Sequence, residues 1–329
     1  MNVLITGGTG FIGSRLALAC VARGYQVRVL GQENTEAESR NHRTLTDAGI
    51  RIIIGSVLNV PTLSSSLAGV DLVFHLAAAQ HEANVPDQKF WDVNVAGTRN
   101  LLSACVEQGV KRVIHGSTIG VYGASLSGEI DEESPSSPDN IYGKTKLEGE
   151  KLALSFCDRL PVVVIRISET YGPGDRRLLK LFRAIKKRMF FMIGGGENLH
   201  HLIYIDDLIE GFLAASVVTH AAGQVFLLGG PKAVSTNEMV SAIATQVGGR
   251  IPGVRAPLGL LLVVAFLLET VFRPLGIQPP LHLRRMDFFK KSFSLSTKKA
   301  QSVLRFEPKV SFNEGVAVTA RWYEEMGEL

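Results

Sequence analysis

A tyrosine and a lysine four residues apart are the side chains in this sequence whose types and spacing could do chemistry. Tyr142 and Lys146 lie in the stretch YGKTK, at the start of a predicted helix over 141–156. This spacing places both on one helix face. A tyrosine with its ordinary pKa of about 10 is a poor acid or base at neutral pH. We expect the Lys146 ammonium to lower the pKa of Tyr142, so that Tyr142 can exchange a proton with an alcohol or a ketone.

Taken alone, a tyrosine and a lysine at this spacing also fit a solvated helix face, so a second feature is needed. Ser117 and Thr118 follow a predicted strand over Arg112–Gly116. Open parallel sheets bind ligands just outside the carboxyl ends of their strands. A hydroxyl of Thr118, with Ser117 as its neighbour, could therefore hydrogen-bond the reacting oxygen of a substrate, although either hydroxyl could instead simply cap the strand end.

A glycine-rich turn opens the chain in the stretch MNVLITGGTGFIG. Gly7 permits the tight turn from strand to helix, Gly10 lets the backbone approach a pyrophosphate, and Gly13 lets helix and strand pack closely. The amino end of the following helix offers free N–H groups and a positive dipole to phosphates. This pattern at the first strand–helix junction predicts a dinucleotide site. The positive charge of an oxidised nicotinamide would add to the effect of Lys146 on Tyr142.

The choice between NAD and NADP depends on the residue that ends the second predicted strand. An acid there holds the ribose 2′-hydroxyl of NAD, but this chain has Gly31, with Glu33 two residues further on. We expect Gly31 to leave space for a 2′-phosphate, with Arg15 or Arg28 as candidate partners. The sequence therefore predicts that NADP is accepted at least as well as NAD, unless Glu33 turns inward.

Short apolar runs alternate with helical stretches through the first half of the chain, which predicts a parallel sheet covered on both faces. We expect an α/β fold: a Rossmann-type, doubly wound domain over residues 1–171, and a mainly substrate-binding domain over 172–329 with some segments returning to the first. Strands are predicted at Asn2–Thr6, Gln26–Leu30, Arg51–Ile54, Leu72–Leu76, Arg112–Gly116 and Val162–Ile167, and helices at Phe11–Arg23, Pro61–Leu67, Phe90–Gln108 and Ile141–Phe156.

Two segments of the second half carry distinctive patterns. The segment 176–188 predicts an amphipathic helix with Leu178, Phe182, Ile185 and Met189 on its apolar face and Arg176, Lys180, Arg183 and Lys187 on its basic face. The basic face is either solvated or meets an anionic part of a substrate. The apolar segment 256–268 is shorter than the about 20 residues of a bilayer span. We interpret it as a buried or lid helix, or as a peripheral contact with a membrane or an apolar substrate.

The composition sets limits on partners and location. The 329 residues are 46% hydrophobic and 20% charged, with a net charge of +4 that gives no reason to expect nucleic acid. Cys20, Cys105 and Cys157 are scattered, as free thiols of a reducing compartment are, and no signal peptide is visible, so we expect a cytoplasmic protein. His200 and His201 are adjacent, which is not a metal-ligand spacing, and no metal is predicted.

The chain resembles the extended short-chain dehydrogenase/reductase family, also called the NAD-dependent epimerase/dehydratase family. The resemblance runs from Met1 almost to the end of the chain. Its motifs are TGGTGFIGSRL, DLVFHLAA, NVAGTRNLL, GSTIGVYG, YGKTKLEGE, YGPGDRRLL, HLIYIDDLIEGF and FSLSTKKAQSVLRFEPKVSFNEGV. The stretch YGPGDRRLLKLF is most similar to the hydroxysteroid-dehydrogenase-like branch.

This resemblance implies roles for named residues. Tyr142 is the implied acid/base, Lys146 binds the nicotinamide ribose, and Thr118 completes the triad. The implied cofactor contacts are Gly7, Gly10, Phe11, Ile12, Gly13, Gly31, Ser56, Val57, Ala77, Ala78, Ser117, Tyr142, Lys146 and Ile167.

The sequence departs from the family pattern at two further places besides Gly31. Ser56 stands where the family often has an aspartate near the adenine. Glu169 stands near the place of an asparagine that binds the diphosphate of sugar-nucleotide substrates. A carboxylate there would repel a diphosphate.

Two enzymatic hypotheses follow. The first is hydride transfer between NAD(P) and a secondary alcohol or ketone of a bulky, steroid- or terpenoid-like small molecule. The alternative is epimerisation or dehydration of a nucleotide sugar with retained NAD. A cofactor-sensing or scaffold protein is a weaker third reading, because binding alone does not need Tyr142, Lys146 and Thr118. The resemblance also implies a homodimer that pairs the helices Phe90–Gln108 and Ile141–Phe156, with Leu147, Leu152 and Leu154 as apolar surface.

Overall fold

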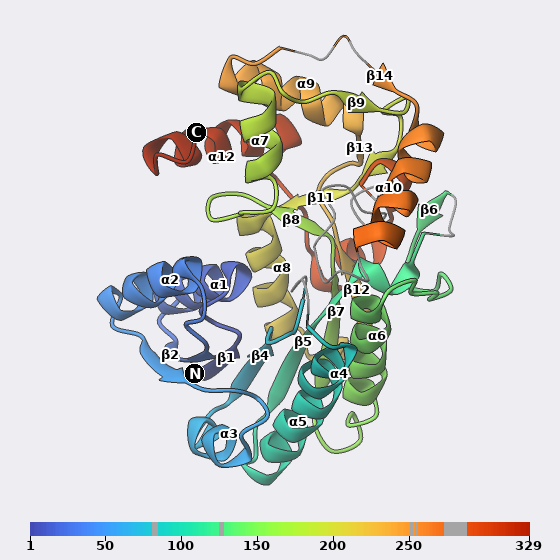
Figure 1. Cartoon of the computed structure of the whole chain (residues 1–329). Coiled ribbons are helices and arrows are strands. Elements are labelled where there is room, and N and C mark those ends of the chain that lie inside the picture. Colours follow the sequence, from blue (N-terminus) through green and yellow to red (C-terminus); the bar gives the residue numbers. More distant parts are fainter. Residues whose placement is uncertain (81–84, 125–127, 251–252, 254, 273–287) are drawn as a thin grey trace.

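The structure is a computed structural model, and it describes all residues except 81–84, 125–127, 251–252, 254 and 273–287. Its centre is a seven-stranded, fully parallel sheet in the order β12-β7-β5-β4-β1-β2-β3 (Figure 1). The strands are β1 (Asn2–Thr6), β2 (Gln26–Gly31), β3 (Arg51–Ile54), β4 (Leu72–His75), β5 (Arg112–Thr118), β7 (Val162–Ile167) and β12 (Val225–Leu228). The predicted Rossmann-type α/β fold is confirmed. Ser117 and Thr118 are the last residues of β5, not the loop after it.

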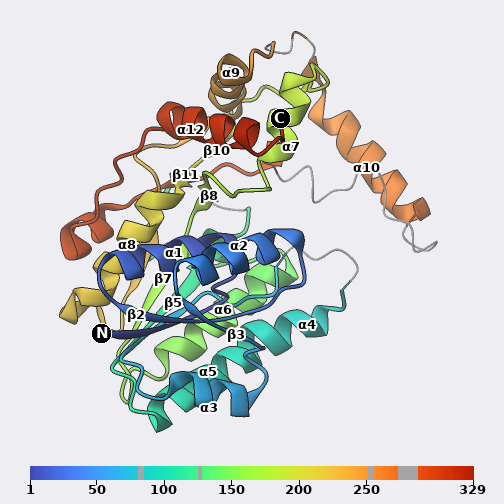
Figure 2. The ribbon, with the colours of Figure 1, turned by 90° about the vertical axis from the view of Figure 1, so that its left-hand side faces the viewer.

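Helices cover both faces of this sheet, as Figure 2 shows. One face carries α1 (Phe11–Ala22), α2 (Glu36–Asp47) and α8 (Ile205–Val217), and the other carries α3 (Val60–Leu67), α4 (Asp87–Trp91), α5 (Gly97–Glu107) and α6 (Ile141–Leu154). Successive side chains of β1 show the alternation: Val3 and Ile5 belong to one apolar core and Leu4 to the other.

Helix α2 is absent from the sequence prediction. Its residues are mostly polar and only Leu45 is buried, so the sequence shows no apolar stripe that would predict a helix here. Its start is set by a capping box, in which Thr35 and Glu38 each accept from the other's backbone N–H. The capping box consists of polar residues, so an analysis of apolar periodicity does not detect the start of this helix.

The second half of the chain contributes to the central sheet as well as to a smaller part above it. β12 pairs with β7, and α8 packs against α1, so these two elements belong to the layers of the central sheet. The other strands form two-stranded pairs: β8 (Glu169–Tyr171) with β11 (Leu202–Tyr204), β9 (Met192–Ile193) with β14 (Arg255–Ala256), β10 (Leu199–His200) with β13 (Val234–Ser235), and β6 (Glu129–Ile130) with β15 (Ser294–Leu295). Helices α7 (Leu179–Lys186), α9 (Thr236–Val247) and α12 (Phe312–Glu325) pack together beside them (Figure 1).

Helix α7 is shorter than predicted, and this changes the place of Met189. Arg188 takes a left-handed backbone conformation with φ of 57°, just beyond the helix. Phe182 and Ile185 are buried as expected, but Met189 is 73% exposed, so its assignment to the apolar face is wrong. Part of the basic face is used inside the chain, because Arg176 and Arg183 both form ion pairs with Glu328. Lys186, which is not one of the four residues predicted for that face, pairs with Glu324 of α12. Arg176 and Arg183 therefore already have an anionic partner within the chain.

The apolar segment 256–268 forms most of helix α10 (Leu258–Phe272). Leu258, Leu261 and Leu262 pack near Ile193, whereas other apolar side chains of this helix face water. A wholly buried helix is therefore wrong as a description of this segment. Within the described residues, none of the helices has the length and apolar character to cross a membrane.

Candidate active site

The glycine-rich turn has the shape that a dinucleotide needs. Gly7 has φ of +68°, and a Cβ atom on it would lie 2.7 Å from the backbone nitrogen of Ala77. A Cβ on Gly13 would collide with the carbonyl oxygen of Gly7, so larger residues fit at neither position. Helix α1 starts after Gly10 with no side-chain cap and no acid in its first turn. The amino end of α1 therefore fits a phosphate group.

The other residues that the resemblance assigns to the cofactor lie around the carboxyl edge of the same sheet. Phe11 and Ile12 open α1, and Gly31 ends β2. Ser56 and Val57 follow β3, and Ala77 and Ala78 follow β4. Ser117 is the last residue but one of β5, and Ile167 is the last residue of β7. Parallel strands bring these positions to one edge, although they are spread over about half of the chain.

The expected space for a 2′-phosphate at Gly31 is wrong. The Thr9 side chain already fills it, because a Cβ on Gly31 would collide with Thr9 Oγ1. Neither candidate arginine stands ready for a phosphate: Arg15 forms a 2.6 Å ion pair with Asp206, and Arg28 donates to the carbonyl oxygens of Ser66 and Ala68. Neither the space at Gly31 nor the two arginines therefore supports the prediction that NADP binds at least as well as NAD.

The structure brings Thr118 and Tyr142 together through a side-chain hydrogen bond between β5 and α6, and their catalytic roles stay predictions. The predicted fall in the pKa of Tyr142 is wrong for the protein chain by itself. Burial raises the pKa of Tyr142 to about 12, and the hydrogen bond with Thr118 opposes this only in part. Desolvation dominates because the phenolate must lose its water shell on burial.

The side chain of Lys146 points toward strand β5. Its Nζ atom donates to the carbonyl oxygen of Gly116 at 2.5 Å. Burial lowers the pKa of Lys146 to about 8, and the carboxylate of Glu150, one helix turn further on, works in the opposite direction. The charge state of Lys146 is therefore sensitive to pH in the range where enzymes work.

A buried network behind Lys146 was not predicted from the sequence. Ser117 Oγ donates to Glu150 Oε2 at 2.7 Å, and Arg166 Nη2 donates to Glu150 Oε1 at 2.6 Å. Arg166 also donates to the Tyr122 hydroxyl at 2.6 Å. The ion pair between Glu150 and Arg166 is almost fully buried. The only signal in the sequence was the continuation of the four-residue spacing from Tyr142 and Lys146 to Glu150.

Asn94 is a second residue that sequence reasoning passed over. Its side chain accepts from the backbone N–H of Ala79, donates to the Ala79 carbonyl, and donates to Thr145 Oγ1 at 3.0 Å. It thereby joins the loop after β4 to the helix that carries Tyr142 and Lys146. The stretch NVAGTRNLL contains this residue, but only the tertiary structure shows what Asn94 holds together.

Glu169 is not an isolated carboxylate. Its Oε2 atom lies 3.1 Å from His200 Nδ1, and its Oε1 atom lies 4.0 Å from Arg177 Nη1. Burial alone would raise the pKa of Glu169, but the hydrogen bond with His200 and the charge of Arg177 lower it to about 2. The expected repulsion of a diphosphate is weakened because the negative charge of Glu169 is compensated by these neighbours.

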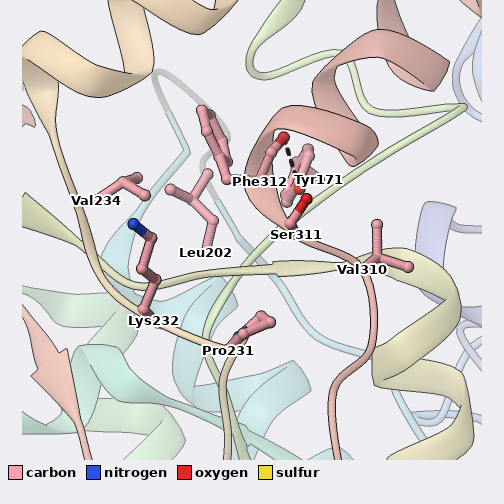
Figure 3. Close-up of a pocket in the computed structure, with 8 residues that line it drawn as sticks. All are labelled: Tyr171, Leu202, Pro231, Lys232, Val234, Val310, Ser311 and Phe312. Carbon is pink, nitrogen blue, oxygen red and sulfur yellow. Dashed lines mark hydrogen bonds between the residues drawn. The ribbon is translucent and has the colours of Figure 1, made fainter.

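Figure 3 shows a pocket away from the Tyr142–Lys146 pair. It is lined by Tyr171, Leu202, Pro231, Lys232, Val234, Val310, Ser311 and Phe312. The Tyr171 hydroxyl donates to the Phe312 carbonyl across one side of it. No predicted site residue lines this pocket. Among the residues that the structure describes, no cluster of possible metal ligands occurs, and the three cysteines are free thiols.

A parallel sheet with a phosphate-accepting turn at one strand end, and a tyrosine–lysine helix beside another, defines the class of dinucleotide-dependent α/β oxidoreductases. Comparison with known proteins narrows the class. A model of the NAD dependent epimerase/dehydratase family matches residues 3–229. The chain belongs to this family.

Relatives of two kinds share most of the chain. The N-acetyl-alpha-D-glucosaminyl-diphospho-ditrans,octacis-undecaprenol 4-epimerase of Escherichia coli O157:H7 is 30% identical, over 79% of this chain and 77% of that protein. The 3beta-hydroxysteroid-dehydrogenase/decarboxylase isoform 1 of Arabidopsis thaliana is 28% identical, over 96% and 78%. A solved structure of UDP-glucuronic acid 4-epimerase from Bacillus cereus in complex with NAD is 26% identical, covers 99% of both chains and has a TM-score of 0.81.

Proposed function

We propose that this protein is an epimerase or dehydratase that oxidises and re-reduces the sugar ring of a glycosyl diphosphate with retained NAD. The observation that carries the proposal is the hydrogen bond of Thr118 with Tyr142 at the sheet edge that also holds the glycine-rich turn. The likeness to two 4-epimerases of sugar-diphosphate substrates supports it. This choice replaces the steroid- or terpenoid-like substrate as the leading hypothesis.

In this proposal, each residue of the triad has one task. The glycine-rich turn and Lys146 would hold NAD, which would supply a reversible hydride acceptor for a ring carbon of the sugar. Tyr142 takes the proton of the hydroxyl on that carbon and gives it back when the ketone is reduced, so that protons and hydride balance over a turnover. Thr118 hydrogen-bonds the reacting oxygen. Lys146 holds the nicotinamide ribose and favours the charged form of Tyr142, together with the positive charge of the oxidised cofactor.

The surroundings of Glu169 bear on the substrate. Arg177 lies beside the carboxylate, and His200 hydrogen-bonds it. A diphosphate that approached this place would meet the guanidinium as well as the carboxylate. We propose that Arg177 supplies the attraction that the family's asparagine supplies elsewhere.

A hydroxysteroid-type dehydrogenase is the second candidate. The likeness to the Arabidopsis thaliana enzyme over 96% of the chain favours it, as does the apolar surface of α10. A dehydrogenase releases its reduced cofactor at each turnover, whereas an epimerase retains it. Cofactor exchange therefore separates the two candidates.

Assembly and location remain proposals. Leu147, Leu152 and Leu154 each pack partly into the apolar cores of their own chain, while Trp91 on α4 is 39% exposed. We retain a homodimer through α5 and α6, with Trp91 rather than the leucines as its apolar contact, and light scattering tests it. A cytoplasmic location is likewise retained.

The deciding experiment uses the purified full chain with UDP-glucose, UDP-N-acetylglucosamine and UDP-glucuronic acid, analysed by NMR for the 4-epimer or a dehydrated sugar. We expect a new sugar without net formation of reduced nicotinamide, and NAD that stays with the protein through gel filtration. Stoichiometric reduced nicotinamide from a 3β-hydroxysteroid, with no change in any sugar, would reverse the order of the two candidates.

A further inference from the structure

Helix α10 exposes an apolar face that the rest of the described chain leaves uncovered. Val263, Val264, Phe266 and Leu267 are between 37% and 58% exposed. The opposite side of the helix holds it to the protein through Leu258, Leu261 and Leu262. Figure 2 shows α10 standing out from the remainder of the molecule. Adjacent exposed apolar side chains of this size mark a contact with a partner or a membrane.

A second exposed segment, Lys187–Phe191, lies at the base of the same helix. Met189 and Phe191 are 73% and 47% exposed, and Lys187 and Arg188 are exposed as well. The segment runs into β9, which pairs with β14 immediately before α10. Phe190 also stacks on Phe289, with ring centroids 6.4 Å apart, and Phe289 packs against Ile193, as Leu258 of α10 does. Cationic and apolar side chains are thus joined at one end of the molecule.

The length of α10 and the charge beside it indicate which kind of partner this surface binds. At about 1.5 Å per residue, the 15 residues of α10 are too short to cross a bilayer but long enough to lie along one. Apolar side chains beside lysine and arginine are typical of segments that bind anionic membrane surfaces. We infer that the outer face of α10 and the segment Lys187–Phe191 dock this protein on an anionic lipid bilayer.

The experiment is co-sedimentation of the full chain with phospholipid vesicles. Vesicles of phosphatidylcholine alone are compared with vesicles containing about one third phosphatidylglycerol, at low and high salt. We expect binding to the anionic vesicles that weakens with salt. The double variant Phe266→Asp/Leu267→Asp should reduce the partition coefficient at least about tenfold, because two charges replace apolar side chains at the membrane interface. Lys187→Glu/Arg188→Glu should reduce it by about fivefold or more for each residue.

Val217→Asp is the matched control, because Val217 is 64% exposed and ends α8 beside Ser216, away from α10. Circular dichroism and thermal unfolding verify that each variant folds. Absence of vesicle binding, or equal loss in the Val217 variant, would overturn the inference. Equal binding to both kinds of vesicle would overturn its electrostatic part. The protein could also show twice its monomer mass in solution and no vesicle binding. If only the Phe266→Asp/Leu267→Asp variant then returned it to the monomer mass, the face would be assigned to a second copy instead. None of these readouts depends on the proposed reaction.

Discussion

The surroundings of α6 and of α10 differ in what their side chains contact. Behind α6 three buried polar side chains meet one another: Ser117, Glu150 and Arg166 form a continuous set of hydrogen bonds. Around α10, Phe266 and Leu267 meet water. A closed polar network holds a catalytic geometry without help from outside, whereas an open apolar face needs a partner. We therefore expect changes near α6 to have large effects, and changes at half-exposed positions nearer the surface to have small ones.

The largest effect is expected from Tyr142→Phe. Loss of the only group proposed to carry the proton should lower kcat by about 10²- to 10⁴-fold. The fold and NAD affinity should be retained, because the ring stays in place. Steady-state kinetics and cofactor titration measure the two quantities. Tyr25→Phe, which removes a hydroxyl just after α1, is the control and should leave kcat unchanged. Unchanged turnover in the Tyr142 variant would refute the proposed role.

Glu150→Gln tests the closed network directly. Removing one partner of the buried ion pair leaves the Arg166 charge uncompensated, which should lower the free energy of unfolding by about 3–5 kcal/mol. Urea unfolding measures this. Glu148→Gln breaks the exposed pair with Lys151 on the same helix and should cost at most about 1 kcal/mol. Equal losses in the two variants would show that burial of the pair does not matter here.

The pH dependence of kcat/KM should report Lys146. Burial lowers the pKa of Lys146 to about 8, so its charge is present below that pH and lost above it. We expect kcat/KM to fall about tenfold per pH unit above about pH 8, because the neutral amine no longer favours the Tyr142 phenolate. Glu150 raises the pKa of Lys146, so the fall should begin at lower pH in Glu150→Gln. A fall that begins at the same pH in this variant would assign the titration to another group.

Glu169→Gln should have a smaller effect, and it should improve the binding of a UDP-sugar. The pKa of Glu169 is about 2, so the side chain is charged at every pH of interest. Its removal leaves Arg177 free to attract a diphosphate, and KM for a UDP-sugar should fall by up to about tenfold with kcat little changed. Comparison with a substrate that lacks the diphosphate is the control. A rise in KM would mean that Glu169 itself contacts the substrate.

The smallest effect concerns the cofactor. Because Thr9 fills the space at Gly31 and Glu33 lies nearby, 2.9 Å from His42, we expect NAD to bind more tightly than NADP. The ratio should be about tenfold, or about 1.4 kcal/mol, and should narrow in Glu33→Gln. Calorimetric titration of both cofactors measures the ratio. Tighter binding of NADP would restore the sequence-based prediction and require a phosphate partner other than Arg15 or Arg28.

The sequence by itself determined the parallel sheet, the glycine-rich turn, and the shared helix face of Tyr142 and Lys146. Each is a local pattern: apolar runs of strand length, glycines at fixed spacing, and two side chains one helix turn apart. Local patterns survive folding because they depend on residues that are neighbours along the chain.

The tertiary structure alone decided the pKa of Tyr142, the filling of the Gly31 space by Thr9, the pairing of Glu150 with Arg166, and the compensation of Glu169 by His200 and Arg177. It also decided which side of α10 faces the protein. Burial and electrostatic partnership depend on residues far apart in the chain, and a one-dimensional pattern carries neither the desolvation of a side chain nor the charge that folding brings beside it.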